Sequence, residues 1–306
     1  MASSNWFTIL YGPSGAGKST VAGKAAPMGL FYSPKGGMSS ASSYLGIDLK
    51  VVPATGVAEA TELIRKNHKK YPAITIDDLS LIIDQELARL RKSYSGWTVF
   101  DKLNERVYDL RDAAREASCH ILLTMHEQPP REIKKHDSTR YIKGGPLCPG
   151  YQLPEKLPAM ADFVARIVYD PSALGWPYVF QVGPDAEYVT KDRYSIAPPR
   201  FPLNIGELQR EAGYEIALPK GMEWMEKGVE ALAQKLLPEL GKEEPDIKKI
   251  LVPFASKLGN KISDQRHIRW CLSDALDRAV LRLLREGLVT NFIINLTEKE
   301  EDMLNV

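Results

Sequence analysis

The chain has 306 residues, and 44% of them are hydrophobic, which is enough to build the core of one large domain or of two domains of ordinary size. Its formal net charge of only +1 excludes a strong overall attraction to nucleic acid, so such an affinity requires a local basic patch. Three widely separated cysteines, Cys119, Cys148 and Cys271, lack metal-ligand spacing and fit a reducing compartment.

A phosphate-binding loop follows the first predicted strand. Residues 6–11 are a mostly apolar run typical of a buried strand, and the residues after the loop predict a helix that Pro27 ends. In such loops backbone N–H groups and the helix N-terminus surround the phosphates of a nucleotide; here Lys18 is expected to reach the β- and γ-phosphates and the Ser19 hydroxyl to bind Mg²⁺. The complete spacing and flanks disfavour a simple glycine-rich turn. The predicted nucleotide-binding residues are Gly12, Pro13, Ser14, Gly15, Ala16, Gly17, Lys18, Ser19 and Thr20.

The next segments alternate between strand and helix patterns. Residues 29–33 predict a second strand, which residues 34–37 break into a loop, and residues 46–52 predict a third strand. A helix is predicted after Thr55, because its apolar residues recur on one face. This alternation is typical of an α/β fold with a mostly parallel sheet.

A second nucleotide signal is the apolar strand predicted at residues 73–76, which ends in Asp77 and Asp78. About 60 residues after a phosphate loop, this is a Walker B pattern. A carboxylate at the carboxyl end of a neighbouring parallel strand can hold Mg²⁺ through its water shell, and Asp77 has that position. Asp78 is placed to orient an attacking water. The alternative interpretation is an ordinary turn after a strand.

Two helices are predicted next, at residues 79–92 and from Thr98 onward. They precede a buried strand at residues 119–125, whose end carries His126 and Glu127. A polar residue at the tip of the strand next to Walker B commonly senses the γ-phosphate, so His126 and Glu127 join the candidate catalytic residues Lys18, Asp77 and Asp78. Hydrogen bonding of a lone histidine to a loop carbonyl is the alternative.

Residues 128–150 have no clear period and are predicted to form a basic loop. A structureless insertion longer than ~15 residues is usually functional or disordered. Cations and an aromatic residue, Tyr141, suit a nucleic-acid backbone and its bases, although a solvated loop without a ligand is the alternative. The candidate DNA-binding residues are Arg131, Lys134, Lys135, Arg140 and Lys143.

The remaining segments predict a helix at residues 157–164, a strand at 165–169, and a hairpin of strands 178–182 and 187–190. A proline-rich segment at residues 198–202 is the candidate domain border, and helical patterns follow it. The sequence therefore predicts a core domain at residues 1–200 and a smaller helical C-terminal domain at residues 201–306. The helical stripes there are most simply core faces, and an oligomerisation or nucleic-acid module is the alternative.

The order of these motifs resembles that of the phage-encoded RecA-like AAA-type NTP-binding proteins, some of which are annealing recombinases. The resemblance covers about residues 6–200, and the phosphate loop is its only sharp motif. It rests on the phosphate loop and on residues 74–78, 122–127, 144–146, 157–162 and 191–193.

The resemblance implies a RecA-like P-loop NTPase core with ATP and Mg²⁺ as cofactors. It also implies a homo-oligomer, either a ring or a filament, in which a neighbouring subunit completes the nucleotide site; Lys191 and Arg193 are the candidates for that role in trans. Single-stranded DNA is the implied ligand of the loop after His126. One departure is that Lys35 stands where relatives usually carry a water-activating glutamate, so hydrolysis is weak unless Asp78 or Glu127 substitutes.

Two other functions share these motifs. The phosphate loop also resembles that of nucleoside-monophosphate kinases, although the sequence lacks a compact arginine-rich lid, and a packaging or helicase motor shares the same core. An ABC-type ATPase is disfavoured because no Leu-Ser-Gly-Gly signature occurs. The first five residues lack a basic region before an apolar run, and no apolar stretch approaches the roughly 20 residues of a membrane span. We therefore expect a cytoplasmic protein, in the host cytoplasm if phage-encoded, without a membrane partner.

Overall fold

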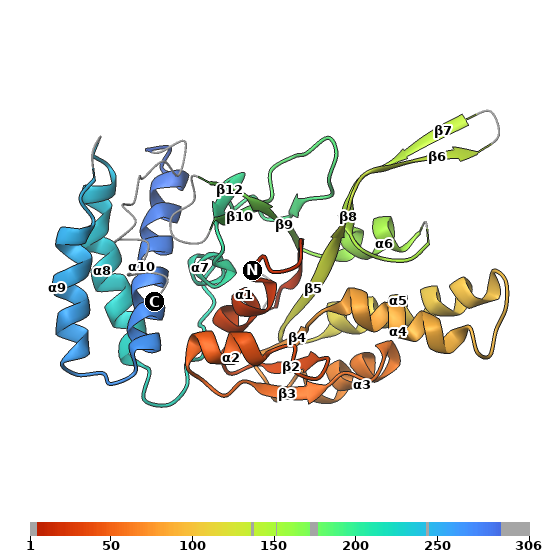
Figure 1. The fold of residues 1–306 in the computed structure, drawn as a ribbon, viewed down its shortest axis with the longest axis horizontal. Coiled ribbons are helices and arrows are strands. Elements are labelled where there is room, and N and C mark those ends of the chain that lie inside the picture. The colour runs from red at the N-terminus through yellow and green to blue at the C-terminus, as the bar shows by residue number, and fades with distance from the viewer. Residues whose placement is uncertain (1–4, 136–137, 151, 172–176, 243–244, 289–306) are drawn as a thin grey trace.

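The computed structural model describes residues 5–135, 138–150, 152–171, 177–242 and 245–288. The main strands are β1 (Phe7–Gly12), β2 (Leu30–Ser33), β3 (Lys50–Pro53), β4 (Ala73–Ile76), β5 (His120–Gln128), β9 (Phe163–Tyr169), β10 (Tyr178–Gln181) and β12 (Arg200–Pro202). They form one sheet in the order β12-β10-β9-β1-β5-β4-β2-β3 (Figure 1). The pairs from β9 to β3 are parallel, and β10 and β12 extend the sheet with antiparallel pairs. The predicted α/β fold with a mostly parallel sheet is confirmed.

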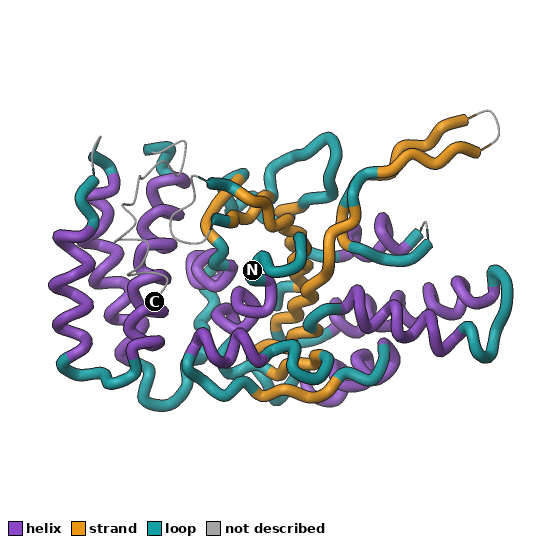
Figure 2. Tube along the Cα trace, viewed as in Figure 1, coloured by secondary structure: helices purple, strands orange, loops and turns teal. Residues whose placement is uncertain are grey.

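Helices cover both faces of the sheet (Figure 2). One apolar cluster joins the sheet to α3 (Val57–Asn67), α4 (Leu79–Leu90), α5 (Thr98–Glu116) and α6 (Leu153–Met160). The other joins it to α1 (Lys18–Ala25), α2 (Ser39–Leu45), α7 (Ile205–Glu211), α8 (Trp224–Leu240), α9 (Lys248–Gly259) and α10 (Gln265–Arg285). Within β1, Ile9 and Tyr11 face the first cluster and Leu10 faces the second, which explains the consecutive apolar residues 9–11 of a strand buried on both faces.

Ion pairs as well as apolar contacts attach α10 to the rest of the fold. Lys24 on α1 lies 2.7 Å from Asp274, and the buried Arg278 lies 2.7 Å from Glu207 on α7. Burial lowers the pKa of Lys24, but the carboxylates of Asp274 and Asp277 raise it further, so the net shift is upward and the lysine is charged. Because such a pair is costly to break on one side, α10 is held in a defined position beside α1.

The border predicted between residues 200 and 201 falls within β12, and the helices beyond it share one apolar cluster with the sheet. The division into two domains stays a prediction.

No helix among the described residues is both long enough and apolar enough to cross a bilayer.

The prediction that residues 128–150 form a loop without regular structure is wrong. β6 (Arg131–Lys135) and β7 (Ser138–Ile142) pair as an antiparallel arm that projects from the body of the molecule, and β8 (Gly145–Pro146) pairs with the end of β5 (Figure 1). A two-stranded arm away from the core buries little surface, so its strands need no apolar alternation and give no sequence period.

Three other expectations differ from the structure. The helix expected at 157–164 is α6, which ends at Met160, and the following residues enter β9. The expected hairpin at 178–190 is wrong, since β10 pairs with β9 and β12, and the short β11 (Lys191–Asp192) also pairs with β9. The residues after the second strand include α2, whose serine-rich sequence buries only Ala41 and Leu45 and lacks a helical apolar stripe.

Candidate functional site

The turn between β1 and α1 is shaped by glycines. Gly15 and Gly17 have φ angles of 77° and 88°, in the left-handed region that disfavours any side chain. A Cβ atom at Gly12 would lie 2.8 Å from the Cβ atom of Ile167 on β9, so this position also requires glycine. The backbone can therefore curve into a compact loop ahead of the N-terminus of α1, as phosphate binding requires.

The side chain of Lys18 is folded into this loop. It is buried, and its Nζ atom donates hydrogen bonds to the carbonyl oxygens of Gly12, at 3.1 Å, and Pro13, at 2.7 Å. Burial lowers the pKa of Lys18, while the nearby carboxylates of Asp78, Asp77 and Glu127 act in the opposite direction. A desolvated ammonium group whose hydrogen-bond partners are neutral carbonyls favours exchange of those partners for a phosphate oxygen.

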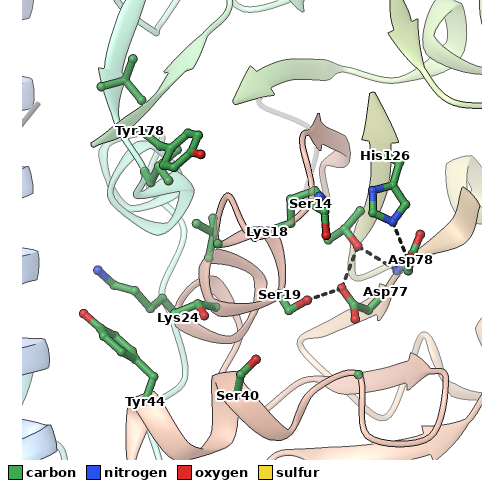
Figure 3. A pocket seen from close by; sticks show the side chains of 18 of the residues that line it. Ser14, Lys18, Ser19, Lys24, Ser40, Tyr44, Asp77, Asp78, His126 and Tyr178 are labelled. Carbon is green, nitrogen blue, oxygen red and sulfur yellow. Dashed lines mark hydrogen bonds and ion pairs between the residues drawn. The ribbon is translucent and has the colours of Figure 1, made fainter. Parts of the chain in front are cut away.

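Asp77 is the centre of a hydroxyl cluster at the carboxyl ends of the parallel strands. Its carboxylate accepts hydrogen bonds from Ser19 at 2.9 Å, Thr124 at 2.7 Å and Ser33 at 3.0 Å. Figure 3 shows the hydrogen bond from Ser19. Burial raises the pKa of Asp77, although the three hydroxyl groups lower it. A serine hydroxyl beside a carboxylate, next to a phosphate loop, fits the oxygen ligands that Mg²⁺ prefers when phosphates and waters complete its shell. Sequence reasoning placed Asp77 and Ser19 together, and the structure does the same.

Asp78 and His126 form a second pair at the same edge of the sheet. Asp78 has a φ of 52° and caps α4, because its side chain accepts a hydrogen bond from the N–H of Leu81. Its other carboxylate oxygen lies 2.9 Å from Nε2 of His126 at the end of β5. β5 lies between β1 and β4 in the sheet, so its end places His126 beside Asp78 at the edge that carries the phosphate loop (Figure 3).

Glu127 has different partners. The guanidinium group of Arg166 on β9 makes two hydrogen bonds to its carboxylate, at 2.8 and 3.0 Å, and lies over the ring of Tyr188 with 3.2 Å to the centroid. Glu127 is absent from the described residues that line the cavity around the phosphate loop. The structure therefore brings Lys18, Asp77, Asp78 and His126 together and places Glu127 in an ion pair beside them.

A cavity of about 650 Å³ contains these groups. Residues of the phosphate loop, both carboxylates and His126 line one part of it, and Lys35 also lines it (Figure 3). Its volume is in the range of cavities that hold small-molecule ligands and cofactors. Residues from α1, α2, β10 and α10 line the rest of it.

The candidate DNA-binding residues lie in and beside the projecting arm. Arg131 donates a hydrogen bond to the carbonyl of Gly150 at 2.8 Å, and Lys143 donates one to the carbonyl of Asp185 at 2.6 Å. Lys134 and Lys135 lie in β6 and Arg140 lies in β7, but their side chains are outside the description of the structure. By backbone register, the two lysines pair with the first residues of β7, at the far end of the arm.

The candidates for a role in trans lie far from the phosphate loop of their own chain. β11 pairs with the first residues of β9, and Phe163 of β9 pairs with Thr8 near the start of β1, whereas the loop follows the other end of β1. Lys191 donates a hydrogen bond to the carbonyl of Ala159, and Arg193 lies 2.8 Å from Asp162. The structure thus places both at the amino edge of the sheet.

Sequence reasoning missed two residues of the site, Ser33 and Thr124. Both hydroxyl groups hydrogen-bond to Asp77. Their signal was positional, because Ser33 is the last residue of β2 and Thr124 is a polar residue within the apolar run of β5. The strand order was needed to show that β2 and β5 flank β4.

A family model described as an AAA domain matches residues 4–194. The chain belongs to the AAA domain family. Two crystal structures are similar to this chain at low sequence identity. That of the RadB recombinase has 13% identity and a TM-score of 0.34, and the match covers 55% of this chain and 76% of that chain. That of a KaiC-like protein of Pyrococcus horikoshii OT3 has 15% identity and a TM-score of 0.37, and the match covers 61% of this chain and 82% of that chain. No curated protein matches the chain.

Membership of the AAA domain family confirms the predicted P-loop NTPase core. The assignment of nucleotide binding to the loop before α1 stays a prediction. The match ends before α7, so the helices α7 to α10 lie outside it. Single-stranded DNA and a phage source stay predictions.

Proposed function

We propose that this AAA domain protein is an ATPase that uses Mg²⁺ and acts on single-stranded DNA in recombination or replication of a phage. The observation that supports the first part most strongly is the convergence of Lys18, Ser19 and Asp77 in one cavity ahead of α1. A cation for the phosphates, a hydroxyl and a carboxylate for the metal, and a helix N-terminus are the parts that a phosphoryl-transfer site requires.

The residues have separate roles in this proposal. Lys18 leaves its two carbonyl partners and neutralises the β- and γ-phosphates, while Ser19 and Asp77 hold Mg²⁺, which supplies further charge neutralisation when bound. Asp78 orients the attacking water, because it lines the cavity and is held by His126 and by the N-terminus of α4. With Lys35 at the place of the usual glutamate, we expect slow hydrolysis.

An assay of phosphate release from ATP, with and without single-stranded DNA, tests this function. We expect slow release that requires Mg²⁺ and rises with DNA. Phosphate transfer to a small-molecule acceptor, with no release to water under any of these conditions, would instead establish the kinase alternative.

The proposed DNA contact is the arm of β6 and β7. The support is its connection to the site: β5 carries His126 at the cavity, pairs with β8 at Glu127 and Gln128, and continues into β6 three residues later. A change in the tilt of the strand end on γ-phosphate binding therefore reaches the arm through continuous backbone. Because the arm is already a paired hairpin, we propose that nucleotide binding moves the whole arm and does not order a loop.

Removal of three cations from the arm should weaken DNA binding. In the triple variant Lys134→Ala, Lys135→Ala and Arg140→Ala, we expect unchanged ATP affinity and weaker binding of single-stranded DNA. The log–log dependence of affinity on salt should flatten by about 2, since each phosphate contact on a single strand contributes about 0.7. Fluorescence anisotropy with a labelled oligonucleotide at several salt concentrations measures both quantities.

The matched control is Lys66→Ala, Lys69→Ala and Lys70→Ala, which removes the same charge from exposed lysines at the end of α3. This variant should keep the wild-type affinity and salt dependence. Equal losses in both triple variants would show that only net charge matters, and wild-type behaviour of the arm variant would place the DNA site elsewhere. Arg131 and Lys143 are left intact because they hydrogen-bond to backbone carbonyls.

We also propose that the protein acts as a homo-oligomer in which Lys191 and Arg193 contact the nucleotide of a neighbour. Mixing Arg193→Ala with Lys18→Ala subunits should then restore part of the lost activity, because some interfaces pair one intact half-site with another. ATPase activity is measured across mixing ratios, with assembly followed by light scattering. Absence of rescue in confirmed mixed assemblies would assign Arg193 the local role of pairing with Asp162.

A further inference from the structure

The cavity extends well beyond the groups that contact phosphates. From the phosphate loop it continues along α1, where Thr20 and Lys24 lie one turn apart on the same face and both line it. Figure 3 shows Lys24, Tyr44 and Tyr178 on the side of the cavity opposite Asp77, Asp78 and His126. The triphosphate thus accounts for one end of the cavity only.

The far end is lined by apolar and aromatic side chains from three separate parts of the chain. Tyr178 begins β10, Leu203 follows β12, and Leu276 and Val280 lie one turn apart on α10. Leu276 and Val280 are almost fully buried. Apolar and aromatic walls of this kind suit an aromatic base and the carbon face of a ribose, not a phosphate.

Polar groups accompany these walls. Ser273 and Asp277, also one turn apart on α10, line the cavity beside Lys24. The ammonium group of Lys24 on α1 lies 2.7 Å from the carboxylate of Asp274, and the side-chain amide of Asn204 at the start of α7 donates a hydrogen bond to Asp277 at 3.0 Å. These contacts fix this face of α10 relative to α1 and α7. A few fixed polar groups among apolar residues are typical of a site that recognises a small organic molecule.

We propose that α10 forms the binding wall for the nucleoside, that is the base and the ribose, of the nucleoside triphosphate whose phosphates the loop before α1 binds. The inference rests on the proposed nucleotide binding. It assigns a part of the nucleotide site to a helix outside residues 4–194 of the AAA domain match. The C-terminal helices are then part of the nucleotide site itself.

The test separates the nucleoside from the phosphates. ATP and inorganic triphosphate, each with Mg²⁺, are titrated by calorimetry against the full chain and its variants. We expect Leu276→Ala to weaken ATP binding by about 5- to 20-fold, because apolar contact with the nucleoside is lost, and to leave inorganic triphosphate binding unchanged. The matched control is Leu272→Ala, one turn earlier on α10, where the leucine is equally buried but is not among the residues that line the cavity.

A second pair of variants guards against a folding defect in α10. Tyr178→Ala changes a partly buried residue of the cavity wall, and Tyr169→Ala changes its exposed neighbour on β9, whose ring lies 5.7 Å away. Selective loss of ATP affinity in Leu276→Ala and Tyr178→Ala alone supports the proposal. Unchanged ATP affinity in both would overturn it, as would equal losses of ATP and inorganic triphosphate. If wild-type protein binds neither, the proposed function itself fails.

Discussion

Lys18→Ala should lower the affinity for ATP by about 100-fold or more, because hydrogen bonds to charged groups contribute about 1.5–3 kcal/mol each and the lysine makes more than one with phosphate. In the nucleotide-free protein the lysine is buried against the carbonyls of Gly12 and Pro13, and burial lowers its pKa. A lysine with a lowered folded pKa destabilises the fold at neutral pH, and this cost disappears above its unfolded pKa. The substitution removes this cost together with the two hydrogen bonds to the carbonyls, so we expect the Tm without nucleotide to change little.

The matched control for this variant is Lys35→Ala. Lys35 also lines the cavity, but its side chain is exposed, so solvent screens its charge and we expect a much smaller loss of ATP affinity. Calorimetric titration of both variants provides the comparison. Equal ATP affinity in Lys18→Ala and wild type would exclude the lysine as the phosphate ligand and would remove the basis for the proposed catalytic site.

The parts of the fold that could be predicted are those in which one local pattern determines the structure. The run from Trp6 to Tyr11 is mostly apolar on both faces because β1 lies in the middle of the sheet, and the loop after it requires glycines at φ angles that other residues avoid. The helix beginning at Val57 has a clear apolar stripe, since one face contacts the sheet and the other contacts solvent. In such segments local propensity and tertiary burial agree.

Elements that depend on distant partners could not be predicted. The turn signal at Gly183-Pro184-Asp185 indicates a hairpin, but Phe180 pairs with Ile167 and with Phe201, which are far from it in sequence. The helix predicted at residues 157–164 is displaced from α6, which contains both Pro154 and Pro158. Pro154 is near its first turn, where a missing N–H costs nothing.

The same distinction applies to the candidate site. Lys18, Ser19 and Asp77 follow from motifs with fixed spacing, whereas Ser33 contacts Asp77 only because β2 lies next to β4. The far wall of the cavity was not predicted at all, because Leu276 is about 250 residues from the phosphate loop and its helical stripe is typical of any core helix. A pattern within one helix indicates burial but not the partner.

Asp77→Asn should abolish the dependence of turnover on Mg²⁺ while leaving metal-free nucleotide binding nearly intact. The carboxylate acts on the nucleotide through the metal, so its loss should lower ATP turnover about 100-fold. Burial raises the pKa of Asp77, and a carboxyl group with a raised folded pKa destabilises the fold increasingly as pH rises through that pKa. Asparagine removes this buried charge, so we expect the Tm of the metal-free variant at pH 7 to be no lower than that of wild type.

Asp78→Asn is the matched control for Asp77→Asn, since it makes the same chemical change at the adjacent cavity residue, which lies 2.9 Å from His126. If Asp78 orients water, this variant should lose turnover but keep the wild-type dependence of nucleotide affinity on Mg²⁺. ATP titrations with Mg²⁺ and with EDTA, together with phosphate-release rates over a range of Mg²⁺ concentrations, distinguish the two roles. Parallel losses of metal-free and Mg²⁺-dependent ATP affinity in Asp77→Asn would argue that the residue shapes the loop through its hydroxyl partners and does not hold the metal.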